Sequence, residues 1–265
     1  MPEKPADPPP GEAPEPARVT APVTAAVLII GNEVLSGRTQ DANLKFLGER
    51  LAALGIRLME ARVIADDEGA IVDAVNQLRQ AFDYVFTTGG IGPTHDDITA
   101  AAVAKAFGRD FGRHAEAEAR LRAHYEPGDL TEARLTMADM PAGAALLDNP
   151  VSRAPGFRVE NVFVLPGVPR IMQAMFDGLA HALTGGAPLA SRTIIAFIAE
   201  GVMAGPLAAI QKAHPEVEIG SYPFFRAGKI GCSLVARAAD EARLQAAAEA
   251  IGDAVRGLGG EPEEE

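Results

Sequence analysis

Apolar and polar positions alternate between two periods along the first part of the chain. Residues 23–30 form a continuous apolar run rich in β-branched side chains, which predicts a strand buried on both faces of a parallel sheet. Leucines then recur at helical spacing over 43–54 and stop at Gly55, a residue typical of the position after a helix C-terminus. The first two predicted elements are therefore a buried strand and an amphipathic helix.

The same alternation continues up to residue 88. Strands are predicted at 56–64 and 84–88, and the helix between them carries apolar residues at helical spacing over 71–78. Asp66 and Asp67 stand directly before that helix as candidate N-caps. The order βαβαβ predicts an α/β fold.

The remaining pattern predicts the end of this domain and a second, smaller one. Helices are expected at 99–107, with Thr99 as a candidate N-cap, and at 114–125, 131–138 and 170–183, with a hairpin at 157–160 and 162–165. The turn at 184–188 indicates a linker, and beyond it we expect strand 192–199, helix 204–213, strands 216–222 and 229–236, and helix 240–258. The fold class is thus α/β, with a three-layer α/β/α domain around a mostly parallel sheet at 22–184 and a small α+β domain of order βαββα at 187–260.

Composition places the chain among soluble globular proteins of a reducing compartment. Hydrophobic residues make up 48% of the 265 residues, enough for a sizeable core. The single cysteine, Cys232, cannot form an internal disulfide, which agrees with a cytoplasmic location. Residues 1–21 are rich in Pro, Ala and Glu and predict a disordered tail rather than a signal peptide or membrane anchor. The longest apolar run, 25–30, is too short to span a bilayer, so no membrane partner is expected.

The net charge of −12 argues against nucleic acid as a partner. Nonspecific binding to nucleic acid needs a basic surface that displaces counterions, whereas an acidic surface repels a polyphosphate chain. A metal ion can nevertheless bring a phosphorylated small molecule to an acidic site. A small molecule is therefore the expected ligand class.

The stretch TTGGIGPTHDDIT, residues 87–99, combines backbone freedom with negative charge directly after a predicted central strand. Glycines let the backbone approach a ligand and turn N–H groups toward it, and the following helix N-terminus favours anions, so the loop suits phosphate. Asp96 and Asp97 repel phosphate unless a divalent cation such as magnesium bridges the two. The alternative is that either aspartate only caps the helix. His95 is a candidate metal ligand or proton donor, with a solvent-facing loop residue as its alternative.

Four motifs in chain order carry a resemblance to a known family. They are GNEVLSGRTQDAN at 31–43, TGGIGPTHDDIT at 88–99, NPVSRAPGF at 149–157 and LPGVPRIM at 165–172. The chain resembles the competence/damage-inducible protein A (CinA) family, whose molybdopterin-binding domain is shared with molybdenum-cofactor biosynthesis proteins of the MoaB and Mog type. The same motifs resemble the amino-terminal molybdopterin-binding-like domain of eukaryotic FAD synthases. Residues 187–260 are similar to the small KH-type module of CinA proteins, and we expect no nicotinamide-mononucleotide deamidase domain.

The resemblance implies two kinds of activity. Molybdenum-cofactor relatives bind molybdopterin, and some adenylylate it with ATP and magnesium, whereas CinA-type and FAD-synthase-type relatives are associated with metal-dependent hydrolysis of the pyrophosphate in ADP-ribose or FAD. Because TGGIGPTHDD follows the second branch rather than the GGTG-x-x-x-RD form of the first, we expect a nucleotide pyrophosphatase that uses magnesium or cobalt, with potassium as a further candidate cation. One alternative is a molybdopterin-binding protein or adenylyltransferase. The other is a catalytically idle binding or regulatory module, which Asn32 favours because it replaces an aspartate often seen in relatives.

Carried onto this sequence, the resemblance assigns a role to each candidate site residue. The catalytic candidates are Asp97, Asp96 and Asp66, and helix capping is the alternative for Asp66. The metal candidates are Asp96, Asp97 and Glu33. The ligand- and phosphate-binding candidates are Gly89, Gly90, Gly92, Thr94, Arg153, Gly156, Pro166 and Gly167. A plain turn is the alternative for Pro166, and a surface ion pair is the alternative for Arg153. The resemblance also implies a homo-oligomer, a dimer or trimer.

Overall fold

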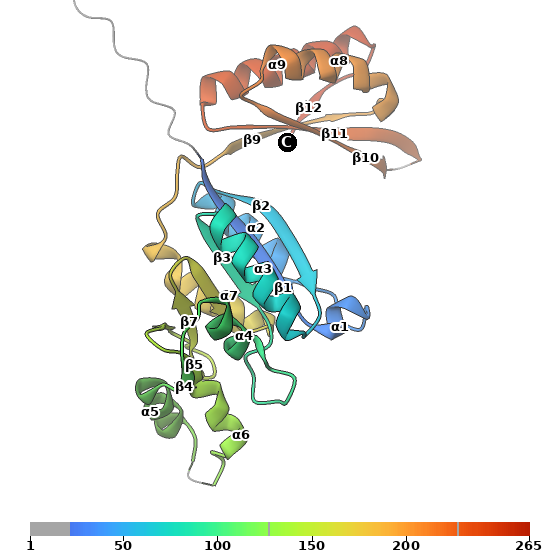
Figure 1. Ribbon diagram of the computed structural model, residues 1–265. Helices are drawn as coiled ribbons and strands as arrows, with labels where there is room; N and C mark the ends of the chain where they lie inside the picture. The colour runs from blue at the N-terminus through green and yellow to red at the C-terminus, as the bar shows by residue number, and fades with distance from the viewer. Residues whose placement is uncertain (1–21, 127, 227) are drawn as a thin grey trace, which may run out of the picture.

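The computed structural model describes residues 22–126, 128–226 and 228–265, which form an α/β domain and a smaller α+β domain (Figure 1). The tail predicted at 1–21 lies outside the described residues. Within the described residues, no helix has both the length and the apolar character needed to cross a bilayer.

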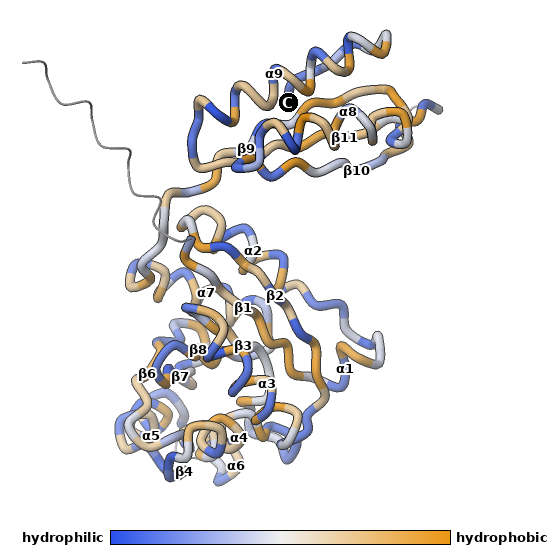
Figure 2. The backbone as a smooth tube through the Cα atoms, turned by 45° about the horizontal axis from the view of Figure 1, so that its top comes forward, coloured by the Kyte–Doolittle hydropathy of each residue, from blue (hydrophilic) through white to orange (hydrophobic). Residues whose placement is uncertain are grey.

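A six-stranded sheet forms the centre of the α/β domain, in the order β2-β1-β3-β8-β7-β6. The strands are β1 (Val23–Ile30), β2 (Ile56–Ile64), β3 (Tyr84–Thr88), β6 (Ala145–Leu147), β7 (Gly156–Val159) and β8 (Val162–Leu165). β2, β1, β3 and β8 are parallel, and β7 runs antiparallel to both of its neighbours. Figure 2 shows the apolar colour along β1, which lies between two strands in the interior of the sheet. The mostly parallel sheet predicted from the sequence is confirmed.

Helices cover both faces of this sheet and give the domain three layers. One face carries α2 (Asn43–Ala53) and α7 (Pro169–Leu179), and the other carries α3 (Glu68–Ala81) and α4 (Thr99–Ala106). Each pair of helices encloses its own cluster of buried side chains against the sheet. The predicted α/β/α architecture is therefore confirmed.

The alternation of side chains along β3 links the two layers. Val85 packs into the core under α3 and α4, whereas the next residue, Phe86, packs into the core under α2 and α7. Because successive side chains of a strand point to opposite faces, Thr87 and Thr88 also face opposite layers at the carboxyl end of the strand. This difference between two adjacent threonines matters for the site described below.

Two helix starts differ from the sequence prediction. α3 is capped by Asp67, whose side chain accepts a hydrogen bond from the N–H of Ala70 at 2.8 Å, and not by Asp66. α4 has Ile98 at its N-cap position without a side-chain cap, so the prediction that Thr99 caps this helix is wrong. Thr99 is instead the first residue of the helix and is fully buried.

Shorter elements connect the strands and helices of these layers along the chain. Residues 115–124, 132–138 and 180–182 fall within helices predicted from the sequence, whereas 32–35, 111–113 and 139–141 were not predicted because three or four residues carry too little periodicity. A two-stranded sheet of β4 (Phe111–Arg113) and β5 (Asp139–Pro141) stands beside α5 (Ala115–His124). The other short helices are α1 (Asn32–Leu35), α6 (Glu132–Leu135), η1 (Thr136–Ala138) and η2 (Ala180–Ala182).

The smaller domain is a four-stranded antiparallel sheet with both helices on one side (Figure 1). Its elements are β9 (Ala190–Ala196), α8 (Glu200–Ala213), β10 (Glu218–Arg226), β11 (Lys229–Ala238), α9 (Glu241–Gly257) and β12 (Glu263–Glu264). A separate cluster of buried side chains, which includes Cys232, fills the space between sheet and helices. Burial raises the pKa of the Cys232 thiol, so this cysteine is an unreactive core residue.

Candidate functional site

Three loops meet where β1, β3 and β8 end, at the carboxyl edge of the parallel sheet. The N–H of Gly89, after β3, donates to the carbonyl oxygen of Leu165 at 3.1 Å. The side-chain Nδ2 of Asn43, after β1, donates to the carbonyl oxygen of Gly167 at 2.8 Å. Gly167 in turn approaches Gly89 so closely that a β-carbon on Gly167 would lie 3.3 Å from the Gly89 Cα. In open α/β sheets this edge is where ligands bind.

The loop after β3 requires glycine at its first two positions. Gly89 and Gly90 have φ angles of 103° and 68°, in the left-handed region that favours glycine. A β-carbon on Gly89 would lie 2.1 Å from the carbonyl oxygen of Ile30, and one on Gly90 would lie 2.1 Å from the Thr99 hydroxyl oxygen. Glycine is therefore needed at both positions, because a side chain would clash with neighbouring protein atoms.

Three consecutive peptide N–H groups remain available in this loop. The N–H of Gly89 is bonded to Leu165, and that of Thr99 donates to the carbonyl oxygen of Gly90 at 2.9 Å. The N–H groups of residues 90–92 donate to no residue in the described part of the chain. They lie just before the N-terminus of α4, whose dipole favours negative charge. This stretch can therefore hold an anion such as a phosphate group.

Asp97 shapes the loop and does not cap the helix. Its Oδ2 accepts hydrogen bonds from the N–H of Thr94, at 2.8 Å, and from the hydroxyl of the same residue. Because α4 has no side-chain cap, the capping alternative is wrong for both Asp96 and Asp97. The carboxylate of Asp97 also lies against Gly92, where a β-carbon would be 2.7 Å from Oδ2. Thr94, Asp97 and Gly92 thus form one compact turn.

Asp96 is the exposed carboxylate of the loop, and His95 beside it is exposed as well. The Thr94 hydroxyl, the backbone N–H of Asp96 and, to a smaller extent, the nearby His95 hold the pKa of Asp96 below its usual value. Its carboxylate is exposed in the same loop as the available N–H groups.

The three carboxylates predicted as metal ligands are not gathered into one cluster. Among the described residues, no group of three or more His, Cys, Asp or Glu side chains is placed to hold a metal ion. Glu33 belongs to α1 and folds back over Gly31, where a β-carbon would lie 2.7 Å from its carboxylate oxygens. Glu33 thus lies near the end of β3, where it lines a hollow together with Thr88. A metal held jointly by Asp96, Asp97 and Glu33 is therefore not built into this structure.

Asp66 joins the end of β2 to the loop after β1. Its Oδ2 accepts a hydrogen bond from the N–H of Asn32 at 2.8 Å. Asp66 thus positions the first turn of the neighbouring loop, a role that the sequence pattern did not indicate.

This difference between neighbouring aspartates gives a test. We expect Asp67→Ala to lower the free energy of unfolding by about 1 kcal/mol, because α3 loses its N-cap, and to leave ligand affinity unchanged. Asp66→Ala is expected to cost a similar amount, about 1 kcal/mol, and also to weaken ligand binding several-fold, because the loop after β1 loses its anchor. Urea unfolding and calorimetric titration with molybdopterin or ADP-ribose measure the two effects. Equal binding by the two variants would contradict the role of Asp66.

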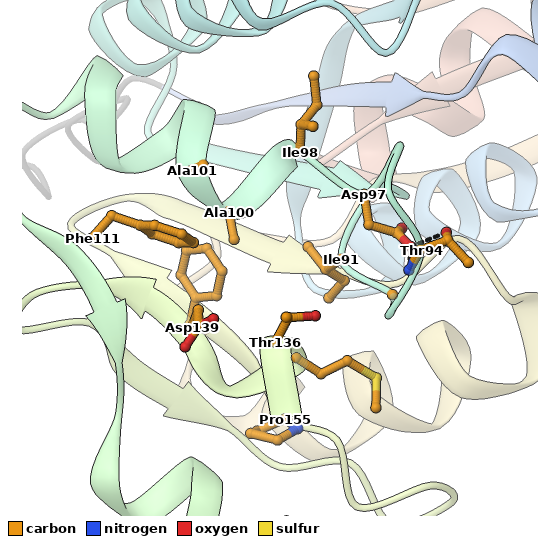
Figure 3. Close-up of a pocket in the computed structure, with 13 residues that line it drawn as sticks. Ile91, Thr94, Asp97, Ile98, Ala100, Ala101, Phe111, Thr136, Asp139 and Pro155 are labelled. Carbon is orange, nitrogen blue, oxygen red and sulfur yellow. Dashed lines mark hydrogen bonds between the residues drawn. The ribbon is translucent and has the colours of Figure 1, made fainter. Parts of the chain in front are cut away.

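A hollow of about 240 Å³ adjoins the glycine loop on the side of α4 (Figure 3). Its loop wall consists of Ile91, Gly92, Thr94 and Asp97, and its opposite wall includes Phe111 and Asp139. Asp139 is paired with Arg113, whose Nε lies 2.6 Å from its Oδ1, and this bond raises the pKa of Arg113. The hollow therefore combines apolar surface with acceptor oxygens beside the anion-binding N–H groups. Phe111 and Asp139 were missed by sequence reasoning because only the tertiary fold brings them to the loop.

A second, smaller hollow of about 40 Å³ lies on the other side, between the ends of β1 and β3. Glu33, Asp41, Asn43, Thr88 and Gly167 line it. Asn43 and Thr88 were not predicted as site residues. Two sequence signals could have indicated them. Asn43 is a polar residue on the apolar, core-facing side of a predicted helix, and Thr88 is a polar residue at the end of a predicted buried strand.

Arg153 and Gly156, two predicted ligand-binding residues, do not line the hollow beside the glycine loop. Arg153 lines a separate hollow with Arg120 and His124, and no ion pair involves it in the described residues. Gly156 is buried within β7, where a β-carbon would lie 2.4 Å from the carbonyl oxygen of Val164. Gly156 therefore permits close packing of β7 against β8, and its neighbours Pro155 and Phe157 line the hollow beside the glycine loop.

The turn after β8 lies at the carboxyl edge of the sheet and lines the small hollow. Pro166 is half-buried, and Gly167 lines the small hollow. Pro169 is the first residue of α7, where its fixed φ suits a helix start and its missing N–H costs nothing. The turn thus serves both as the strand-to-helix connection and as a wall of the site.

Comparison with known proteins identifies the family. Residues 26–185 match the family model described as "Probable molybdopterin binding domain", and residues 188–258 match the model of the FAD synthase middle domain. The chain belongs to the molybdopterin-binding domain family. The resemblance predicted from the four motifs is thereby confirmed.

Relatives of this molybdopterin-binding family member cover different parts of the chain. A protein of Aeropyrum pernix is 36% identical over 261 residues, covering 91% of this chain and 97% of that protein. A CinA-like protein of Geotalea uraniireducens is 40% identical over 158 residues, covering 57% of this chain and 38% of that protein. The crystal structure of CinA from Thermoplasma acidophilum has 35% identity and a TM-score of 0.58, and the match covers 62% of this chain and 99% of that one.

Proposed function

We propose that this protein binds a phosphorylated pterin of the molybdopterin type at the carboxyl edge of its sheet. The observation that carries the proposal is the run of available peptide N–H groups at 90–92, just ahead of α4. Such a run holds the oxygens of a phosphate group through backbone hydrogen bonds and the helix dipole. The family match over 26–185 supports this ligand class.

The residues present fit this ligand. Gly90 and Gly92 bring the backbone close without side chains in the way, and the turn made by Thr94 and Asp97 maintains the shape of the loop. The hollow of about 240 Å³ next to the loop is lined by Phe111 and by acceptor oxygens such as that of Asp139. A flat ring with amino and N–H donors suits such a wall, because apolar surface covers its faces and acceptors meet its edge.

A second candidate function is hydrolysis of the diphosphate bond in ADP-ribose or an FAD-type dinucleotide. The observation that favours it is Asp96, an exposed carboxylate in the same loop as the N–H groups proposed to bind phosphate. Residues 87–99 contain no Lys or Arg, so a diphosphate needs a cation at this acidic position. Asp96, with one oxygen of Asp97, would hold a magnesium or cobalt ion, which supplies charge neutralisation to the diphosphate. The protein itself contributes the N–H groups that orient the phosphates.

One set of incubations separates these functions. Purified protein is titrated calorimetrically with molybdopterin, and is separately incubated with ADP-ribose, FAD, or ATP plus molybdopterin, each with magnesium or cobalt. Tight binding of molybdopterin without dinucleotide cleavage supports the proposal, and adenylylated pterin would identify a transferase. Release of AMP from ADP-ribose or FAD supports the second candidate. Failure to bind any of these compounds overturns both and leaves a module without this ligand site. Self-association as a dimer or trimer stays a prediction.

A further inference from the structure

The small hollow between β1 and β3 lies at the point where the chain changes direction across the sheet. The loop after β1 leads to α2 on one face, whereas the loop after β3 leads to α4 on the opposite face. The two loops therefore diverge and leave a crevice between the strand ends. Ligands of open α/β sheets bind in this kind of crevice.

Two polar side chains that line this hollow have buried atoms without a partner. The exposed fraction is 1% for Thr88 and 2% for Asn43. The Nδ2 of Asn43 donates to the carbonyl oxygen of Gly167, which fixes the amide orientation and makes Oδ1 an acceptor. Neither this Oδ1 nor the hydroxyl oxygen of Thr88 has a hydrogen-bond partner in the described residues. A buried polar atom left unbonded is unfavourable, so a donor group that enters the hollow and meets either atom gains a hydrogen bond.

The remaining wall limits what that occupant can be. Glu33 and Asp41 add carboxylate oxygens, and no Lys, Arg or His lines the hollow. The hollow is therefore rich in acceptors and repels phosphate. A volume of about 40 Å³ admits a hydroxyl or amino group but not an aromatic ring. The lining therefore suits a group that donates hydrogen bonds.

We infer that this hollow binds a hydrogen-bond-donating end of the same ligand whose phosphate occupies the N–H groups of 90–92. Thr88 directly precedes Gly89, and Gly167 lines the hollow while approaching Gly89, so one molecule can reach both places. The donor is a hydroxyl of a ribose or the amino edge of a pterin, which share this chemistry. Thr88 and Asn43 are then positions that select ligands by their donor groups. This inference rests on the proposed function.

The strand supplies a matched pair of variants for the test. Thr87 and Thr88 are both buried, both have an unpartnered hydroxyl oxygen, and they face opposite layers. Only Thr88 lines the hollow. Thr88→Val and Thr87→Val each replace a hydroxyl by a methyl group of similar size, and Thr88→Ser keeps the hydroxyl. We expect all three to retain the Tm of the unmodified protein within about 3 °C, because no hydrogen bond of the protein is lost.

Calorimetric titration of these variants uses three probes: molybdopterin, ADP-ribose and inorganic pyrophosphate. We expect Thr88→Val to weaken binding of molybdopterin or ADP-ribose about tenfold, and Thr87→Val and Thr88→Ser to leave it unchanged, because only the first loses the buried hydroxyl that meets the donor. Pyrophosphate, which has no such donor, should bind all variants equally. The probe whose affinity falls identifies the donor as ribose hydroxyl or pterin amine.

Three outcomes overturn the inference. Equal affinity of Thr88→Val and the unmodified protein for both large probes removes the hollow from the ligand site while leaving the proposed function intact. Equal losses in Thr87→Val and Thr88→Val show a general effect on the strand. Affinity of the unmodified protein that depends on sodium or potassium, and is lost when tetramethylammonium replaces them, assigns the hollow to a cation. Absence of binding by the unmodified protein to all three probes overturns the proposed function itself.

Discussion

Asp97→Ala is expected to weaken binding of molybdopterin or ADP-ribose by about tenfold to a hundredfold, because two hydrogen bonds to a charged acceptor disappear from the glycine loop. The N–H and hydroxyl of Thr94 lose their hydrogen-bond acceptor. The turn that positions residues 90–92 is then no longer stabilised by these bonds. The N–H groups that hold the phosphate then do not converge. Calorimetric titration measures the loss of affinity. If the protein hydrolyses dinucleotides, AMP release from ADP-ribose or FAD is expected to disappear as well.

Asp96→Ala is the control for this change. Asp96 is exposed, and the N–H of Thr94 donates to Asp97 and not to Asp96, so replacement of Asp96 should leave loop shape and molybdopterin affinity close to those of the unmodified protein. Loss of metal-dependent hydrolysis in Asp96→Ala with affinity retained would assign the metal-facing role to this residue. Unchanged affinity and turnover in Asp97→Ala would remove Asp97 from the site.

Gly89→Ala is expected to destabilise the α/β domain by about 3 kcal/mol or more and to lower its Tm by about 10 °C. An alanine at a φ of 103° is strained, and its β-carbon would lie 2.1 Å from the carbonyl oxygen of Ile30, so β1 and β3 must move apart. Thermal unfolding followed by circular dichroism measures the shift. Ligand binding should be lost as well, because Gly89 begins the loop that holds the phosphate.

Gly37→Ala is the matched control, because it introduces backbone strain at a positive φ without a steric clash. Gly37 also has a positive φ, 72°, but a β-carbon there would meet no atom within 4 Å. We expect a loss of only about 1 kcal/mol from backbone strain and no effect on binding. Equal Tm changes in the two variants would show that close packing against Ile30 does not determine the requirement for glycine.

Long apolar runs and helical stripes made most of the α/β domain predictable. β1, β2 and β3 match their predicted bounds. β1 is a continuous apolar run, which is typical of a strand buried in a parallel sheet, whereas β2 at the sheet edge alternates apolar and charged residues. The short strands β4, β5 and β6 were missed, since three residues show no period and form only where a neighbour supplies hydrogen bonds.

In the candidate site, too, local features could be predicted from the sequence and contacts between distant residues could not. The glycine-rich loop and its place before a helix could be predicted, because glycine followed by a helix start is a local signal that needs no distant partner. Its binding of phosphate stays a prediction. The roles of the acidic residues could not be predicted in the same way. Asp97 bonds within its own turn, Asp66 bonds to Asn32, and Glu33 folds over Gly31, so the expected metal cluster is absent among the described residues. A carboxylate accepts whichever donor the fold brings near, and spacing along the chain does not say which.

Local patterns in the amino acids thus sufficed for the layered α/β architecture and for the glycine-rich loop at its carboxyl edge, since burial periodicity and glycine geometry act over a few residues. Contacts between distant segments decided which polar atoms remain unsatisfied at the carboxyl edge. Asn43 became an acceptor in the crevice only because its amide donates to Gly167, 124 positions later, and Thr88 joined it only because β1 and β3 lie side by side. The atoms that select a ligand therefore emerge from packing, because a hydrogen bond depends on distance in space and not on separation in sequence.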